Sequence, residues 1–165
     1  MREADFERLY DEHAQALFGF LVYRTGDRAL AEDVVADTFE RALRARRRFD
    51  PRKGSEKTWL YSIALNRLRD TARRAGAEGR AVERLAAGTA EHDASRTIEQ
   101  VEARRTVASA MSVLSDEERE AVALRFGGEL SLKELAKVTG VPMTTAEGRV
   151  YRALAKLRDV LEAPA

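Results

Sequence analysis

A stretch near the C-terminus combines residue types that recognise nucleic acid. It reads LKELAKVTGVPMTTAEGRVYRALAKLR over residues 132–158, with small polar residues followed by regularly spaced cations. An arginine can pair bidentately with the edge of a guanine, and threonine or lysine can hold phosphate oxygens. The candidates for contact with duplex DNA are Thr144, Thr145, Glu147, Gly148, Arg149, Arg152 and Lys156.

Helical spacing separates most of these candidates from the apolar residues. At 100° per residue, with Ala146 set to zero, the apolar side chains fall between about −20° and 80°. The opposite arc, from about 200° to 300°, holds Gly148, Arg152, Thr145, Lys156 and Arg149. Glu147 lies near about 100° on this wheel, on the flank of the apolar arc. Its carboxylate therefore leaves the cationic face intact and can accept a hydrogen bond from cytosine N4.

The segment before this helix predicts a helix-turn-helix. The sequence SLKE at 131–134 is a capping box that opens a short helix, Gly140 makes the turn, and Pro142 shapes the next entry. We expect Thr144 or Thr145 to cap the last helix, which runs to about residue 161. An ordinary helical hairpin with a solvated basic face is the alternative. The combination of cap, turn and amphipathic helix favours the helix-turn-helix.

A second cationic surface is predicted around Trp59. With Trp59 at zero on a helical wheel, a polar stripe falls between about 280° and 340°. The stripe consists of Ser62, Asn66, Arg69 and Arg73, and the loop before it carries Arg52, Lys53 and Lys57. A basic stripe beside an aromatic ring suits phosphate contact together with stacking of unpaired bases. The alternative is that Trp59 belongs to the core and that the stripe is only solvated.

Charge is segregated along the chain, although its net value is only +1. Residues 28–40 carry one arginine against four carboxylates, whereas residues 41–57 carry eight cations against two carboxylates. One face of the acidic segment, read as a helix, consists of Asp33, Ala36, Asp37 and Glu40. Such a face repels DNA, so it either stays solvated or docks on a basic protein partner.

The elements that carry these surfaces are expected to be helices. Apolar residues recur at helical spacing, and no stretch alternates for long enough to indicate a sheet. The predicted fold is all-α, with two small helical bundles joined by a flexible linker. Predicted helices span about 5–25, 28–47, 56–74 and 97–113, the first three capped by Asp5, Asp27 and Ser55. The domains are residues 1–75 and 99–165, and the aliphatic-poor residues 76–98 form the linker.

Composition argues against several other classes of protein. The chain has no cysteine, and His13 and His92 lack metal-ligand spacing, so we predict no metal site and no cofactor. The sequence RKGS has the wrong order for a phosphate-binding loop, and no nucleophile is paired with a base, so we predict no enzyme. No run of about 18 apolar residues is present. We therefore expect a cytoplasmic protein without membrane insertion, monomeric when free.

Four segments in order resemble a known family. They read DFERLYDEHAQALFGFL, LAEDVVADTFERAL, RFDPRKGSEKTWLYSIALNRLRDTARR and LSDEEREAVALRFGGELSLKELAKVTGVPMTTAEGRVYRALAKLR. Together they resemble a small bacterial RNA polymerase sigma factor of the sigma-70 family, extracytoplasmic-function (ECF) type. The resemblance covers nearly the whole chain except the linker.

This resemblance implies a role for each surface. The acidic helix would dock on the β′ clamp of core RNA polymerase through Asp33, Asp37, Thr38 and Phe39. The loop and the stripe after it would melt the −10 promoter element and read it as a single strand, and the last helix would read the −35 element as duplex. The implied partners are core RNA polymerase, through β′ and β, promoter DNA and an anti-sigma factor.

Two departures from the family pattern leave room for other functions. The family usually has glutamine in the clamp-binding helix where this chain has Ala36, and a basic residue followed by serine where it has Glu147 and Gly148. One alternative is therefore a sigma-like protein with weakened initiation. Another is a helix-turn-helix repressor or activator without polymerase, although such a regulator has no use for a loop and stripe that bind single strands.

Overall fold

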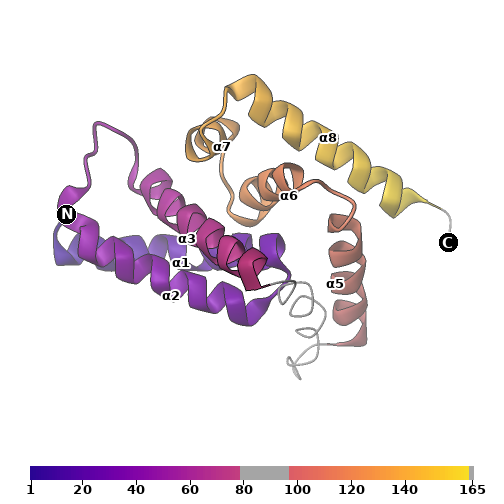
Figure 1. Ribbon diagram of the computed structural model, residues 1–165, viewed down its shortest axis with the longest axis horizontal. Coiled ribbons are helices and arrows are strands. Elements are labelled where there is room, and N and C mark those ends of the chain that lie inside the picture. Colours follow the sequence, from indigo (N-terminus) through magenta and orange to yellow (C-terminus); the bar gives the residue numbers. More distant parts are fainter. Residues whose placement is uncertain (79–96, 164–165) are drawn as a thin grey trace.

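The computed structural model describes residues 1–78 and 97–163, and all regular structure in these residues is helical. The first bundle contains α1 (Glu3–Thr25), α2 (Arg28–Ala45), the 3-10 turn η1 (Arg46–Arg48) and α3 (Glu56–Glu78). The second contains α5 (Ile98–Met111), α6 (Asp116–Val122), the π-helical turn η3 (Ala123–Gly127), α7 (Leu132–Thr139) and α8 (Met143–Glu162) (Figure 1). The predicted all-α fold is confirmed.

Several helix starts follow the local signals in the sequence. The Asp27 carboxylate accepts a hydrogen bond from the Leu30 amide at 3.1 Å, which caps α2. Reciprocal capping boxes open α6 and α7, at 115–118 and 131–134. Each satisfies amides that the first turn of a helix leaves without a partner. Helix α7 therefore begins where the sequence predicts, and the sequence 115–118 opens α6 in the same way.

Other boundaries differ from the prediction. The N-cap of α1 is Arg2, and Asp5 sits inside the first turn, where its carboxylate accepts from the Arg2 amide at 3.1 Å. Pro142 is the N-cap of α8, so neither Thr144 nor Thr145 caps that helix. Helix α3 continues to Glu78, beyond its predicted end at 74. Most of the predicted linker, residues 79–96, lies outside the described residues.

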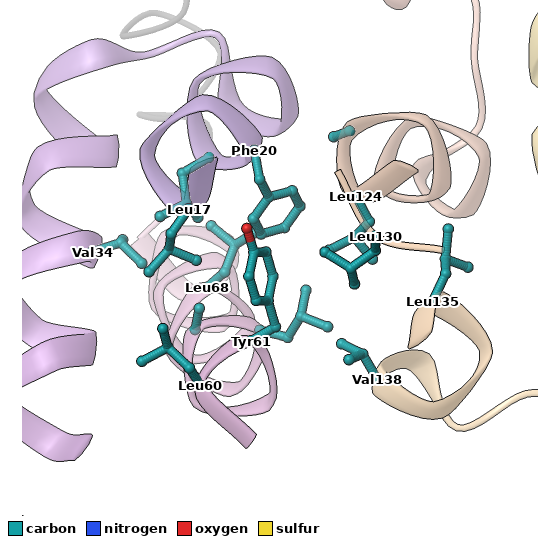
Figure 2. Packing of buried hydrophobic residues seen from close by; sticks show 14 of the residues in the cluster. Leu17, Phe20, Val34, Leu60, Tyr61, Leu68, Leu124, Leu130, Leu135 and Val138 are labelled. Carbon is teal, nitrogen blue, oxygen red and sulfur yellow. The ribbon is translucent and has the colours of Figure 1, made fainter. Parts of the chain in front are cut away.

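The two bundles share a hydrophobic core. Phe20 of α1 and Tyr61 of α3 are fully buried, and their rings lie 5.8 Å apart. They face Leu124 and Leu130 of the second bundle, and Leu135 extends the same cluster into α7 (Figure 2). A smaller cluster fills the far side of the second bundle and consists of Met111, Leu114, Val122 and Ala153. The larger core therefore joins both halves of the chain.

Glycine permits the close approach between the bundles. A Cβ atom at Gly127 would lie 3.0 Å from the Cα of Phe20, and one at Gly128 would lie 2.9 Å from a ring carbon of Tyr61. Contacts this short force a neighbour to move. The buried Tyr61 hydroxyl also donates a hydrogen bond to the Gly128 carbonyl at 3.3 Å. No contact between the bundles was predicted from the sequence.

Candidate nucleic-acid interface

Helices α7 and α8 form the predicted helix-turn-helix. Between them, Gly140 has a φ of 70°, a left-handed conformation that glycine adopts without strain. The amide of Val141 donates to the carbonyl of Ala136 at 3.1 Å, which closes the turn. Ala146, Val150 and Ala153 are buried on the inner side of α8. The opposite side of α8 therefore faces away from this core.

Most of the candidates on α8 lie at the surface. Thr144, Glu147 and Arg152 are exposed, whereas Thr145 and Arg149 are half-buried. Gly148 is half-buried as well, and a Cβ atom there would lie 3.0 Å from a terminal nitrogen of Arg152. The guanidinium group of Arg152 therefore passes close over Gly148.

Lys156 differs from the other cations of α8. Its ammonium group donates to a carboxylate oxygen of Glu118 at 2.6 Å. Glu118 is only 5% exposed, and this bond, together with the capping interaction with Ser115, lowers its pKa to about 2. The structure therefore assigns Lys156 to the neutralisation of a buried carboxylate. The predicted contact between Lys156 and phosphate stays a prediction, and in this conformation the ammonium group is engaged within the protein.

The cationic loop before α3 is exposed at its tip. Arg52 and Lys53 are both exposed, and the guanidinium group of Arg52 lies 3.2 Å from Asp50. The hydrogen bonds from Arg52 hold the pKa of Asp50 below its usual value. At the base of the loop, Trp59 is half-buried and its ring lies 5.2 Å from that of Phe49. The indole therefore packs on the core at one side while its other side reaches the surface.

Some residues of the polar stripe predicted on α3 are exposed, and others are engaged within the protein. Asn66 is exposed, and Arg73 is exposed beside Asp70, with 2.9 Å between their charged groups. Ser62 donates its hydroxyl proton to the Thr58 carbonyl at 2.8 Å. Its hydroxyl is therefore satisfied by its own helix. Arg69 remains half-exposed at 49%.

Two cations of the first bundle reach carboxylates or carbonyls of the second. The Lys57 ammonium group donates to the Glu129 carbonyl at 3.1 Å and lies 3.5 Å from the Glu134 carboxylate. The guanidinium group of Arg69 lies 3.8 Å from the carboxylate of Glu120. We call these contacts the clasp. The second bundle thus engages two residues predicted to bind the −10 strand.

A groove runs between the bundles beside the clasp. Its lining contains Arg24, Arg69, Asp116, Glu117, Glu120, Thr139, Val141 and Arg149. Arg24 also lies 4.0 Å from Asp116 across the two bundles. The groove therefore brings together Arg69, a candidate for the −10 strand, and Arg149, a candidate for the −35 duplex.

The acidic face of α2 is only partly available to a partner. Asp33 is exposed, but Asp37 forms an ion pair with Arg67 of α3 and lies 3.7 Å from Arg41. Thr38 is fully buried and donates its hydroxyl proton to the Val34 carbonyl.

The ring of Phe39 is also buried, because it packs edge-on against Tyr10 at 4.8 Å and against Phe6 at 6.2 Å. Both Thr38 and Phe39 were predicted to contact the polymerase. In this conformation they support the helix from within rather than touch a partner.

Sequence reasoning missed the residues of the second bundle that face the first. Glu134 was recognised as a capping residue, and it has that role as well as its contact with Lys57. Glu120 belongs to the acidic run DEERE, whose charge is opposite to that of the stripe on α3. This complementarity is the signal that could have indicated docking.

Residues 1–78 and 97–163 contain no group of side chains able to hold a metal ion. Within the same ranges, no helix is long and apolar enough to cross a membrane.

Comparisons with known proteins identify both bundles. Residues 9–78 match the family profile for sigma-70 region 2, and residues 110–159 match that for sigma-70 region 4. The RNA polymerase sigma factor CnrH of Cupriavidus metallidurans is 35% identical to this chain over an alignment that is 190 residues long. The alignment covers 99% of this chain and 98% of CnrH. The ECF RNA polymerase sigma factor BldN of Streptomyces coelicolor is 33% identical over 161 residues, which cover 94% of this chain but 61% of BldN.

A solved structure resembles the chain over both bundles. The structure of CnrH in complex with the cytosolic domain of CnrY matches with a TM-score of 0.74 at 29% identity. The match covers 99% of this chain and 92% of the CnrH chain. Sequence profiles, relatives and architecture therefore agree. The chain belongs to the sigma-70 family of RNA polymerase sigma factors, in its extracytoplasmic-function group.

Proposed function

We propose that this chain binds core RNA polymerase and directs promoter recognition and melting in transcription initiation. The observation that carries the proposal is the presence of three chemically distinct surfaces on separate elements. An acidic face lies on α2, an aromatic and cationic surface on the loop and α3, and a helix-turn-helix on α7 and α8. A transcription initiation factor, rather than an enzyme, needs these three surfaces on one chain.

The proposed polymerase contact is the exposed part of the acidic face. Asp33 and Glu40 offer carboxylates to a basic partner, while the Asp37–Arg67 ion pair fixes α2 against α3. Thr38 and Phe39 are buried beneath this face. Ala36 presents a small exposed side chain at its centre. The expected docking site is the β′ clamp, with further contact to β.

The proposed −10 contact combines stacking and phosphate binding. The exposed side of Trp59 can stack on an unpaired base, and exposed Arg52, Lys53 and Arg73 can hold the strand around it. Asn66 can read a base edge through its amide. Lys57 and Arg69 would join this surface once their contacts with the second bundle are released.

The proposed −35 contact is the exposed side of α8. Arg152 and Arg149 would pair with guanine edges, and Thr144 and Thr145 would hold phosphates near the start of the helix. Glu147 is exposed in the first two turns and can accept from cytosine N4. Because Lys156 is engaged with Glu118, it contributes less to DNA binding than its charge suggests.

The proposed setting is the cytoplasm, where the polymerase works on the chromosome. There we expect a monomer when the chain is free, and an anti-sigma factor as the partner that holds it inactive. The relative CnrH has been solved in complex with the cytosolic domain of CnrY, which supports a protein partner of this kind.

The decisive experiment is transcription with purified core polymerase on a library of genomic promoters. Production of defined transcripts that depend on the added chain supports the proposal. A regulator without polymerase would instead bind duplex DNA and leave core polymerase inactive. A sigma-like protein with weakened initiation would bind core polymerase but produce few transcripts, and restoring glutamine at Ala36 would then raise the yield.

A further inference from the structure

We propose that Tyr151 of α8 determines specificity at the −35 element, because its ring packs on the methyl group of a thymine in the major groove. Gly148, about one turn earlier on the same side, allows the helix backbone to approach the bases closely enough for this contact. Tyr151 is not among the residues that the sequence predicted to bind DNA. The inference deepens the proposed function and rests on its −35 contact.

The ring of Tyr151 lies largely in water. It is 63% exposed, and no other aromatic side chain in residues 1–78 and 97–163 is as exposed. Its hydroxyl group has no hydrogen-bond partner within the same ranges. Single exposed apolar residues are common on protein surfaces, so exposure alone does not indicate a function. The position of the ring on α8 therefore decides whether it has a partner.

The buried residues of α8 define which side of the helix faces away from the protein. They are Ala146, Val150 and Ala153. On the wheel with Ala146 at zero, they centre at about 10°, so the outward direction is about 190°. Gly148 and Tyr151 lie at about 200° and 140°, whereas Arg149 lies at about 300° and is half-buried beside the groove between the bundles. Tyr151 and Gly148 are therefore closer to the middle of the outward side than Arg149.

The glycine at position 148 has no packing reason within the protein. Glycine in the interior of a helix is less favourable than alanine, because its backbone loses more freedom on folding. The three atoms nearest to a Cβ atom at this position would all belong to the guanidinium group of Arg152, the closest at 3.0 Å. That side chain is exposed and can move aside. An outward glycine of this kind permits another molecule to approach the helix backbone.

The charges around Tyr151 favour duplex DNA as this molecule. Arg152 and Arg158 are exposed on the two sides of the outward direction, at about 240° and 120°. A major groove has the matching arrangement, with phosphates along both borders and base edges between them. Thymine is the base that presents an apolar group there, its C5 methyl group. The Tyr151 ring can therefore pack on thymine while the arginines hold the phosphates.

Glu147 places this thymine relative to a second base. Its exposed carboxylate lies four residues before Tyr151, on the same flank at about 100°. Four residues of helix span about 6 Å, which is about two base-pair steps of about 3.4 Å. If Glu147 accepts from cytosine N4, as proposed above, the thymine should lie within about two base pairs of that cytosine.

Substitutions at two positions test the contact. Tyr151→Ala removes the ring, and Tyr151→Phe removes only the hydroxyl group; both should leave the circular dichroism spectrum unchanged, because the side chain is exposed. Gly148→Ala should raise the melting temperature of the protein but weaken DNA binding, two effects that a folding defect cannot combine. The matched control is Leu161→Ala, which removes a 54% exposed apolar side chain near the end of the same helix.

The probe is a short fluorescent duplex selected from a randomised library by the full chain at low salt. The selection is repeated with the full chain bound to core polymerase. Each thymine of the selected duplex is then replaced in turn by uracil, which keeps base pairing and lacks only the C5 methyl group. Fluorescence anisotropy gives the dissociation constant of each protein for each duplex.

The expected result is one thymine whose methyl group matters only when the ring is present. Uracil at that position should weaken binding by the unsubstituted chain about fourfold, equivalent to about 0.8 kcal/mol for one buried methyl group. Tyr151→Phe and Leu161→Ala should show the same loss. Tyr151→Ala should bind the thymine and uracil duplexes with the same, reduced affinity, which is the signature of coupling between ring and methyl group.

Three results would overturn the inference. The first is equal sensitivity to uracil in Tyr151→Ala and in the unsubstituted chain. The second is a selection that enriches no duplex. The third is unchanged DNA binding by Tyr151→Ala together with weaker binding to core polymerase, which would assign the ring to a protein contact. The proposed function fails separately, if the chain directs no transcription with core polymerase although the effect of uracil persists.

Discussion

Removal of the Lys156 ammonium group tests whether this residue acts on DNA or on the fold. Lys156→Met keeps an unbranched side chain but leaves the buried Glu118 carboxylate without its 2.6 Å partner. Leaving a buried polar group unsatisfied costs about 1–3 kcal/mol. Because the Lys156 side chain is 48% exposed, water compensates in part, and we expect the lower half of this range. Urea unfolding followed by circular dichroism gives the free energy of unfolding.

The pH dependence gives the same prediction a second measurement. The pKa of Glu118 is lowered from 4.5 to about 2, so the folded state binds fewer protons than the unfolded state between these values. Its contribution to stability is therefore complete above pH 4.5 and is lost as the pH falls toward 2. In Lys156→Met this acid-dependent loss should shrink, because the main cause of the lowered pKa is gone.

Two controls make the result decisive. Lys133→Met removes an exposed lysine from α7 and should change the free energy of unfolding by less than about 0.5 kcal/mol. Glu118→Gln combined with Lys156→Met completes a double-mutant cycle that isolates the coupling between the two residues. Unchanged stability in Lys156→Met, together with a loss of DNA affinity equal to that of Arg152→Ala, would refute the structural role.

Three further predictions address the proposed interfaces. Glu147→Lys should tighten non-specific DNA binding and steepen its dependence on salt. It should also alter the base selected at one position of a randomised −35 library, where the carboxylate contributes about 1–3 kcal/mol of discrimination. Identical base selection by both proteins would show that Glu147 is only a surface charge. Asp33→Lys should weaken binding to core polymerase and change the free energy of unfolding by less than about 0.5 kcal/mol. Asp37→Lys should also destabilise the fold, because Arg67 faces this residue. Unchanged binding of Asp33→Lys to core polymerase would exclude the acidic face as the docking site. Arg69→Ala should reduce open-complex formation more on duplex promoters than on pre-melted ones, and an equal loss on both would indicate simple phosphate anchoring.

The sequence alone predicted the helices, the helix-turn-helix and the family. The helix starts and the turn depend on neighbours within about one turn of the chain, as at the Ser131 cap and the left-handed Gly140, so local patterns identify them. None of the residues predicted for the outer face of α8 is buried, because helical periodicity places residues relative to their own axis. The caps predicted at Thr144 and Thr145 were wrong, because the N-cap of α8 is Pro142, two residues before Thr144.

Only the tertiary structure decided which charged residues remain available. Lys156 and Glu118 are 38 positions apart, and Lys57 meets Glu134 across 77 positions, distances at which sequence spacing has no fixed geometric meaning. A helical wheel assigns a side to each residue but cannot say what packs against that side. Thr38 and Phe39 became buried for the same reason, since α1 and α3 cover their side of α2. Packing between elements distant in sequence therefore separates the cations that can bind DNA from those that hold the protein together.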